Sequence, residues 1–203
     1  MNSKLAVWQL RKMRKMVEGN DLRLAAEWSG KYEILIATIL SAVTRDEVTI
    51  SVCEKLFEKY PTMVDLSRAS VSTVEKIVRR VNYYKTKAKH IVGAAKMLAG
   101  KKIPETTDEL VKLPGVGRKV ANVYLVEAHR KEVIGVDTHV ARISFKLGWT
   151  ESRNPLKVEK DLEKLFPKKY WIRINDTLVR FGKIHGRSRK KEDLILGTFI
   201  NRC

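Results

Sequence analysis

The chain of 203 residues contains only two cysteines, Cys53 and Cys203, which lie far apart. Two cysteines this far apart in sequence favour a reducing compartment over a disulfide framework. Zinc binding is not expected either, because the cysteines and histidines show no metal-ligand spacing. The histidines are His90, His129, His139 and His185. Proline occurs five times and glycine eleven times, so few residues interrupt long regular elements.

Long apolar runs are missing as well. No run approaches the roughly 18 residues of a membrane-spanning helix, and we expect no membrane attachment. The N-terminal segment MNSKLAVWQLRKMRKM lacks the uninterrupted apolar stretch and small residues of a secretory signal. It is basic and mildly amphipathic, which favours an ordinary first helix over a mitochondrial presequence.

Acidic residues are scarce, since 23 Asp and Glu stand against 41 Lys and Arg and give a net charge of +18. Such an excess favours a polyanionic partner, with nucleic acid first. A generally basic proteome or a solubility role would also explain the charge, so charge alone favours nucleic acid only modestly. A hydrophobic share of 44% excludes a disordered chain and supplies a core.

No convincing period-two strand is present, and apolar residues recur at helical spacing through most of the chain. The longer predicted helices cover 31–42, 46–59, 71–80, 84–99, 118–129, 156–166 and 170–181. Thr106 and Glu109 fit a capping box that opens a short helix. Asp137 precedes a further helix that Gly148 ends. The pattern predicts an all-α protein with about ten helices.

One segment joins two predicted helices by a turn with two glycines, and its residues are Leu113, Pro114, Gly115, Val116, Gly117, Arg118 and Lys119. Glycine permits a positive φ and the close approach of another backbone. The amides and the dipole at the start of the second helix suit a phosphate. The alternative is a plain helix–turn–helix, in which the glycines only close the turn and bind no phosphate. The full motif on a chain of this charge favours the DNA backbone, contacted without base specificity.

Lys119 lies in the first turn of that second helix, off its apolar stripe. The helix dipole and Arg118 favour its neutral amine, which can attack a sugar carbon and form a Schiff base. Phosphate binding is the commoner role for such a lysine. Asp137 follows 18 residues later and is expected to cap a helix and stay ionised. A capping role alone would explain it, but a fixed carboxylate also stabilises positive charge on a sugar during glycosidic cleavage.

These residues resemble the endonuclease III branch of the helix–hairpin–helix DNA glycosylase superfamily. Segments 113–125 (LPGVGRKVANVYL) and 135–144 (GVDTHVARIS) are similar to its two signature segments. Segments 35–49 and 83–88 extend the resemblance, as does the spacing from Lys119 to Asp137.

The resemblance implies a two-lobed, all-α fold. A central helical barrel is expected at 23–134, with the helix–hairpin–helix at about 107–129. Residues 1–22 and 135–203 would form the second helical lobe. The active site would lie in the cleft, with a barrel-side nucleophile, Lys119, and Asp137 on the other side.

The resemblance also implies a bifunctional DNA glycosylase and AP lyase that excises damaged bases, oxidised pyrimidines first, and nicks the strand by β-elimination. Lys119 and Asp137 would be catalytic, without a metal or organic cofactor. The partner would be duplex DNA with a damaged base or an abasic site, bound by a monomer. We expect an intracellular, DNA-associated location, in the cytoplasm and nucleoid or in the nucleus. The alternatives are a mismatch thymine or uracil glycosylase of the same superfamily and a non-catalytic DNA-binding module.

Further DNA contacts are assigned by resemblance to Val43, Tyr83 and His139. Relatives push side chains into the DNA stack at the positions of Val43 and Tyr83 while the target base is flipped out. A wedge role and an ordinary loop role are equally weighted for both residues. Relatives commonly carry Gln in place of Val43, and valine cannot hydrogen-bond an orphaned base.

The C-terminal segment departs from the family pattern. Most relatives hold a 4Fe–4S cluster there with four cysteines, whereas this segment has only Cys203, and Gly186 falls near the first ligand position. We therefore expect no cluster and a lobe held by packing alone. The packing residues would be Leu194, Ile195, Leu196 and Phe199. The basic run 183–191 is assigned equally to phosphate contacts and to a solvated face.

Overall fold

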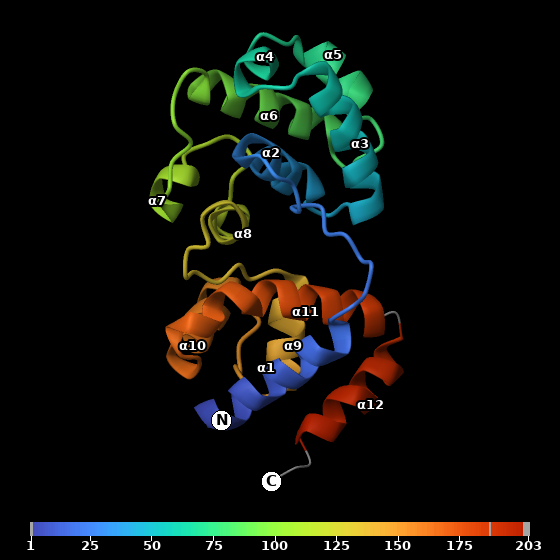
Figure 1. The fold of residues 1–203 in the computed structure, drawn as a ribbon, viewed down its shortest axis with the longest axis vertical. Coiled ribbons are helices and arrows are strands. Elements are labelled where there is room, and N and C mark those ends of the chain that lie inside the picture. Colours follow the sequence, from blue (N-terminus) through green and yellow to red (C-terminus); the bar gives the residue numbers. More distant parts are fainter. Residues whose placement is uncertain (1, 187, 201–203) are drawn as a thin grey trace. The chain divides into compact units, whose positions relative to one another are not determined.

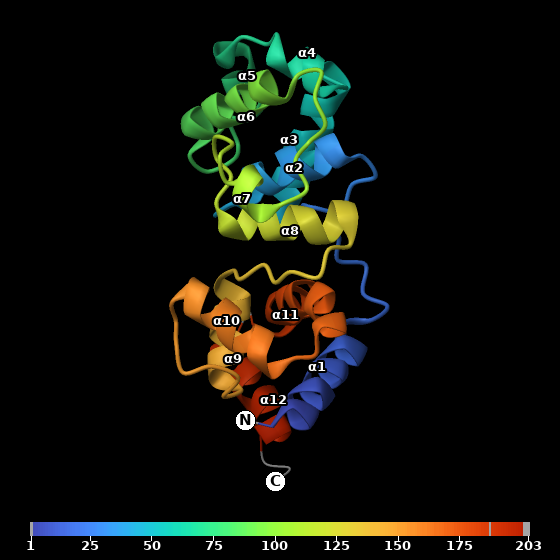
Figure 2. The same ribbon diagram turned by 90° about the vertical axis from the view of Figure 1, so that its left-hand side faces the viewer.

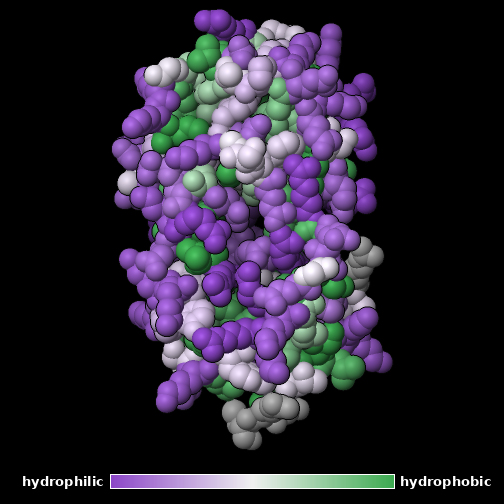
Figure 3. Space-filling model, viewed as in Figure 1, coloured by the Kyte–Doolittle hydropathy of each residue, from purple (hydrophilic) through white to green (hydrophobic). Residues whose placement is uncertain are grey.

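The computed structural model describes residues 2–186 and 188–200. Within these ranges the chain forms twelve α-helices, one short 3-10 helix and no strand. The all-α prediction is therefore confirmed, with more helices than the expected number. No helix of the described ranges is both long and apolar enough to cross a membrane. The face drawn in Figure 3 is covered mostly by hydrophilic residues, with apolar residues in small patches.

The chain divides into two compact units. The central unit is Arg23–Arg130, and the terminal unit combines Met1–Leu22 with Lys131–Cys203. The resemblance implied a boundary after residue 134, but the structure has it after Arg130. Arg130 ends the preceding helix in a left-handed conformation, with φ of 52°. Ile134 and Val136 are already buried in the core of the terminal unit.

The central unit contains seven of the described helices: α2 (Lys31–Ser41), α3 (Asp46–Lys59), α4 (Met63–Ser67), α5 (Val71–Ile77), α6 (Tyr84–Leu98), α7 (Thr107–Leu110) and α8 (Arg118–His129). The nearly continuous apolar sequence of α2 is explained by its place, since it packs against α3, α6 and α8. Figure 1 and Figure 2 both show α2 between α6 and α8. Helix α4 was not predicted, because five residues are too short to show a period.

The terminal unit contains α1 (Ser3–Val17), α9 (Thr138–Lys146), α10 (Pro155–Leu165), the 3-10 helix (Lys168–Tyr170), α11 (Trp171–His185) and α12 (Arg189–Ile200). Helix α11 packs against α1, α9 and α12. The buried side chain of Gln9 joins helices from the two ends of the chain. Its amide donates to the carbonyl of Phe199 at 3.2 Å, and its oxygen accepts from the Trp149 indole at 2.6 Å.

The packing predicted for the C-terminal segment was partly wrong. Leu196 and Phe199 are buried and Ile195 packs against the core, but Leu194 is 74% exposed. Packing alone does not hold α12, because the buried carboxylate of Glu192 forms ion pairs with α9. Residues three or four apart share a helix face. Leu196 and Phe199 are three apart and face the core, whereas Leu194 is two residues from Leu196 and points away.

Candidate active site and DNA-binding surface

The predicted hairpin is formed by α7, a tight turn and α8. The Thr106 hydroxyl oxygen caps α7 by accepting from the Glu109 amide at 3.4 Å. In a full capping box the Glu109 carboxylate would accept from the Thr106 backbone amide. It accepts from the Thr106 hydroxyl at 2.6 Å, so the expected box is incomplete. The Val116 amide donates to the Leu113 carbonyl at 3.1 Å and closes the turn. Both of these side chains are buried, and the Leu113 amide is also paired, with the Leu110 carbonyl at 3.0 Å. These two residues therefore shape the turn, and the structure leaves neither side chain nor amide open for the predicted DNA contact.

Gly115 is required by both conformation and space. Its φ of +77° lies in the left-handed region. A Cβ there would lie 2.8 Å from Cβ of His90 on α6. Next to it, a Cβ on Gly93 would lie 3.3 Å from Pro114. The turn is therefore fitted against α6, and its glycine is explained by this close approach.

Lys119 lies in the first turn of α8, as predicted. Gly117 is the N-cap and contributes no side-chain cap, so the positive end of the helix dipole is not covered by a capping side chain. Gly117 and Arg118 are exposed, and Lys119 is half-buried. This arrangement places a lysine and an arginine at a helix end that suits anions.

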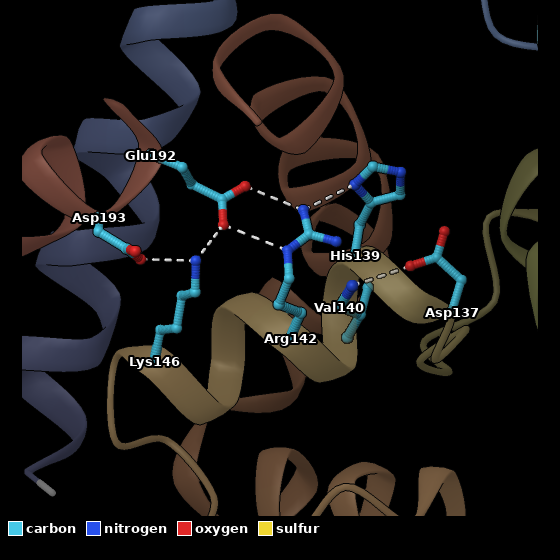
Figure 4. Close-up of polar contacts among 7 residues, drawn as sticks. All are labelled: Asp137, His139, Val140, Arg142, Lys146, Glu192 and Asp193. Atoms are coloured by element: carbon cyan, nitrogen blue, oxygen red, sulfur yellow. Dashed lines mark hydrogen bonds and ion pairs between the residues drawn. The ribbon is translucent and has the colours of Figure 1, made fainter. Parts of the chain in front are cut away.

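Asp137 caps α9 in the terminal unit, as the sequence predicted. Its Oδ1 accepts a hydrogen bond from the Val140 amide at 2.8 Å (Figure 4). Val140 and Ile143 are fully buried, so the helix that Asp137 starts is anchored in the core. Asp137 itself is half-buried. Its carboxylate is thus held in one orientation by a rigid helix end.

His139 is two residues further along α9 and is half-buried. Its Nδ1 lies 3.2 Å from Nη2 of Arg142. Burial lowers the pKa of His139, the charges of Arg142 and Lys183 lower it further, and the carboxylate of Asp137 opposes this change. The ring is therefore held as a neutral imidazole near pH 7.

Val43 and Tyr83 lie on two adjoining loops of the central unit. They are 75% and 72% exposed, and both have a left-handed backbone, with φ of 54° and 57°. Asn82 joins the loops, because its side-chain amide donates to the Val43 carbonyl and its backbone amide donates to the Thr44 hydroxyl at 3.2 Å. Two loops that each carry an exposed hydrophobic side chain are thereby joined.

Lys87 supports the first of these loops from inside the central unit, and it is only 6% exposed. Its ammonium donates to the carbonyls of Leu40 at 2.8 Å and Ala42 at 2.5 Å, and to the Thr44 hydroxyl at 3.0 Å. Burial lowers the pKa of Lys87 to about 8. No role was predicted from the sequence for Asn82 or Lys87. Lys87 is one of many lysines, and only its place within the matched segment 83–88 was a signal.

Comparisons with known proteins agree with this geometry. A family model of the HhH-GPD superfamily base excision DNA repair proteins matches residues 36–168. Endonuclease III of Thermotoga maritima is 41% identical over 155 residues, which cover 75% of this chain and 73% of that protein. The chain belongs to the endonuclease III family. Members of this family are DNA glycosylases and AP lyases of base excision repair, so the resemblance seen in the motifs is confirmed.

Other comparisons extend the likeness. Endonuclease III of Bacillus subtilis is 37% identical over 167 residues, covering 79% of this chain and 75% of that protein. A solved structure of a trapped covalent endonuclease III–DNA intermediate, in an estranged-adenine complex, has a TM-score of 0.84 at 35% identity. It covers 93% of this chain and 90% of that chain. A thermostable thymine-DNA glycosylase has a TM-score of 0.82 at 19% identity over 98% of each chain and shows the fold alone.

The end of α11 does not fit the cysteine ligands that the endonuclease III family implies. A Cβ on Gly186 would lie 2.2 Å from the Gly182 carbonyl and 2.5 Å from Oε2 of Glu192. The position expected for a first ligand is therefore filled by a carboxylate. Cys203 lies outside the described residues. Cys53 is buried in the central unit, and burial raises its pKa to about 12.

The described ranges contain no group of three His, Cys, Asp or Glu side chains that could hold a metal ion. A 4Fe–4S cluster bound by thiolates needs four cysteines, and the whole sequence has two, so the residues present do not fit that group.

Proposed function

We propose that this protein excises damaged bases from duplex DNA and nicks the strand at the resulting abasic site. Lys119 is the nucleophile and Asp137 is the anion that stabilises the reacting sugar. The observation that carries the proposal is the position of Lys119 in the first turn of α8, directly after a glycine turn suited to phosphate. The likeness to an endonuclease III trapped covalently on DNA supports it.

In the proposed reaction, the neutral amine of Lys119 attacks C1′ of the sugar that carries the damaged base. The bond between C1′ and the base breaks, and the base leaves with the electron pair and gains a proton. The sugar ring opens and an imine forms between C1′ and Nζ. Loss of a proton from C2′ then forms a C2′–C3′ double bond and breaks the C3′–O bond, so the strand on the 3′ side leaves with a 5′ phosphate. Water hydrolyses the imine and regenerates Lys119.

Asp137 contributes a carboxylate held by the α9 cap. Positive charge builds on the sugar as the bond to the base weakens, and a fixed anion stabilises that charge without reorganising. Its cap hydrogen bond uses Oδ1. The same carboxylate can take part in proton transfers.

DNA binding in this proposal uses two surfaces of the central unit. The hairpin turn, with Gly115, Gly117 and Arg118, takes a backbone phosphate. Val43 and Tyr83 enter the base stack and fill the gap that the flipped nucleotide leaves. The left-handed backbone and high exposure of both residues support the wedge role. The protein would act as a monomer on its duplex.

Oxidised pyrimidines are the first substrate class of this proposal. A mismatched thymine or uracil is the second, because the apolar Val43 fills space without hydrogen-bonding the base opposite the lesion. A panel of duplexes that differ only in the damaged or mismatched base separates the two. Excision confined to mismatched thymine or uracil would replace the first class by the second.

Borohydride trapping tests the lyase chemistry. Reduction of the imine should link intact protein covalently to a duplex that contains an oxidised pyrimidine or an abasic site. Lys119→Ala should give no adduct, whereas Lys112→Ala, which removes an exposed lysine of the same hairpin, should still be trapped. An undiminished adduct with Lys119→Ala, or none with intact protein, would defeat the assignment. Salt-sensitive binding without cleavage of any lesion would favour a non-catalytic module.

A further inference from the structure

A buried carboxylate lies where the endonuclease III family led us to expect a cysteine ligand. Glu192 of α12 is 1% exposed, yet both of its oxygens are paired. Arg142 donates from Nε to Oε1 at 3.2 Å and from Nη2 to Oε2 at 2.9 Å, and Lys146 donates to Oε1 at 2.7 Å (Figure 4). A buried charge is costly unless it is paired in this way.

The two cations come from α9, one turn apart, and the carboxylate comes from α12. Lys146 also pairs with Asp193 at 2.6 Å, so two positive and two negative side chains balance. The network therefore ties α12 to the helix that begins at Asp137. Arg142 and Glu192 are 50 residues apart in sequence, so their ion pair is a long-range tertiary contact.

Two glycines at one face of α11 leave space for this network. A Cβ on Gly182 would lie 2.2 Å from Nδ1 of His139 and 3.1 Å from Nη2 of Arg142. One turn later, a Cβ on Gly186 would lie 2.5 Å from Oε2 of Glu192. The two glycines thus leave a groove along α11 that the His139, Arg142 and Glu192 side chains fill.

The network ends at the His139 ring. A guanidinium has only donors, so Nη2 of Arg142 donates to Nδ1 of His139, and Nδ1 must accept. The proton of the neutral ring is then on Nε2. In Figure 4 this second nitrogen points away from Arg142 and Glu192. The charged groups that face the ring are Asp137, Arg142, Lys183 and Glu192.

We propose that Glu192 and Arg142 are positioning residues that stand in for the family's cluster and hold His139 as a neutral imidazole. The DNA contact that the resemblance assigns to His139 is then made by its Nε2–H, which lies at the start of α9 beside Asp137, and an oxygen of the DNA backbone accepts. The proposal rests on the proposed function for its DNA substrate. A neutral donor fixed in this way contacts a phosphate oxygen without itself forming an ion pair with Asp137.

The first test follows the His139 ring by nuclear magnetic resonance. Correlation of the ring nitrogens with the ring protons at neutral pH should show hydrogen on Nε2 and none on Nδ1. Arg142→Met removes the donor and a positive charge while Asp137 remains, so the measured pKa of His139 should rise. A wild-type ring with its proton on Nδ1 would overturn the assignment.

The second test measures binding to a duplex with a tetrahydrofuran abasic analogue. Glu192→Gln and His139→Ala should each weaken the Kd about tenfold, as expected for one lost hydrogen bond to a charged group. The double variant should be no weaker than either single variant, because both act through one contact. Asp193→Asn is the matched control. It removes one negative charge at the adjacent position, where the side chain is largely exposed, and should change Kd by less than about twofold.

A Kd for Glu192→Gln that equals that of Asp193→Asn would refute the proposal, as would losses that add in the double variant. Arg142→Lys provides a second route if Glu192→Gln does not fold. Lysine keeps the charge beside Glu192 but lacks the planar fork that reaches two partners, so the same tenfold loss is expected. The trapped adduct distinguishes the two proposals. If wild-type protein gives no adduct but the His139 ring and the Kd values behave as expected, only the lyase assignment is contradicted.

Discussion

The side-chain amide of Asn82 donates to the backbone carbonyl of Val43. This hydrogen bond joins the two loops that carry Val43 and Tyr83, the most exposed large hydrophobic residues of the central unit. Val43 and Tyr83 both have positive φ, a conformation that costs about 1–2 kcal/mol for a residue with a Cβ. A β-branched residue such as valine is especially unusual there. Such strain persists only where the surroundings enforce it, and it is common at functional sites.

Asn82→Ala should therefore release both loops. We expect a loss of about 0.5–1.5 kcal/mol in unfolding free energy and weaker binding to abasic duplex. Asn154→Ala is the control, since it removes the cap of α10 in the terminal unit at a cost of about 1 kcal/mol. Urea unfolding and DNA titration would measure both quantities. Equal loss of DNA binding in the two variants would argue against the loop assignment.

Lys87→Met should destabilise the central unit and the Val43 loop. Methionine fills much of the same space but leaves the carbonyls of Leu40 and Ala42 without their ammonium donor. Leu40 is buried, so its unsatisfied carbonyl costs about 1–3 kcal/mol. Chemical denaturation should show this loss, and hydrogen exchange should show faster opening at residues 40–44. Lys89→Met, an exposed lysine of the same helix, should leave both measurements unchanged.

Asp137→Asn separates the two roles of this residue. Asparagine caps helices about as well as aspartate, so the unfolding temperature should hardly change. Base excision should fall by about 100-fold or more, because the charge that stabilises the sugar is gone. Asp137→Ala should lose both activity and about 1 kcal/mol of stability. Full excision by the asparagine variant would show that Asp137 acts only as a cap.

Gly182→Ala and Gly197→Ala form a matched pair of helical glycines with opposite expectations. A Cβ at Gly182 meets the His139 ring, whereas nothing lies within 4 Å of a Cβ at Gly197. We expect the first change to cost about 1–3 kcal/mol. The second should add about 0.5–1 kcal/mol, since alanine is the better helix former. Thermal unfolding compares them, and equal effects would show that α11 has no fitted groove.

Acid should weaken the Glu192 tie. Burial by itself would raise the pKa of Glu192, but the hydrogen bonds and charges of Arg142 and Lys146 outweigh burial and lower it below 4.5. The unfolded chain then binds more protons than the folded chain in acid, so this stabilisation is present above 4.5 and is lost as pH falls through the folded pKa. The stability difference between wild type and Glu192→Gln should shrink from about pH 6 to about pH 3. A difference that stays constant would contradict this linkage.

Features that depend on neighbours in sequence were predictable from the chain alone. The nearly continuous apolar run of 31–42 located α2, and the string from Leu113 to Lys119 located the hairpin turn. The cap at Asp137 was predictable for the same reason, because its partner, the Val140 amide, is three residues away. Interactions over one helical turn leave a pattern in the residues themselves.

Contacts between distant residues were decided only by the tertiary structure. Lys87 and Leu40 are 47 residues apart, and Arg142 and Glu192 are 50 residues apart. In sequence, Glu192 is one acidic residue in a basic C-terminal segment, and nothing marks it as buried. Whether a charge is solvated or enclosed depends on which helices pack around it and on where glycines leave room, and the packing of remote helices has no local signature.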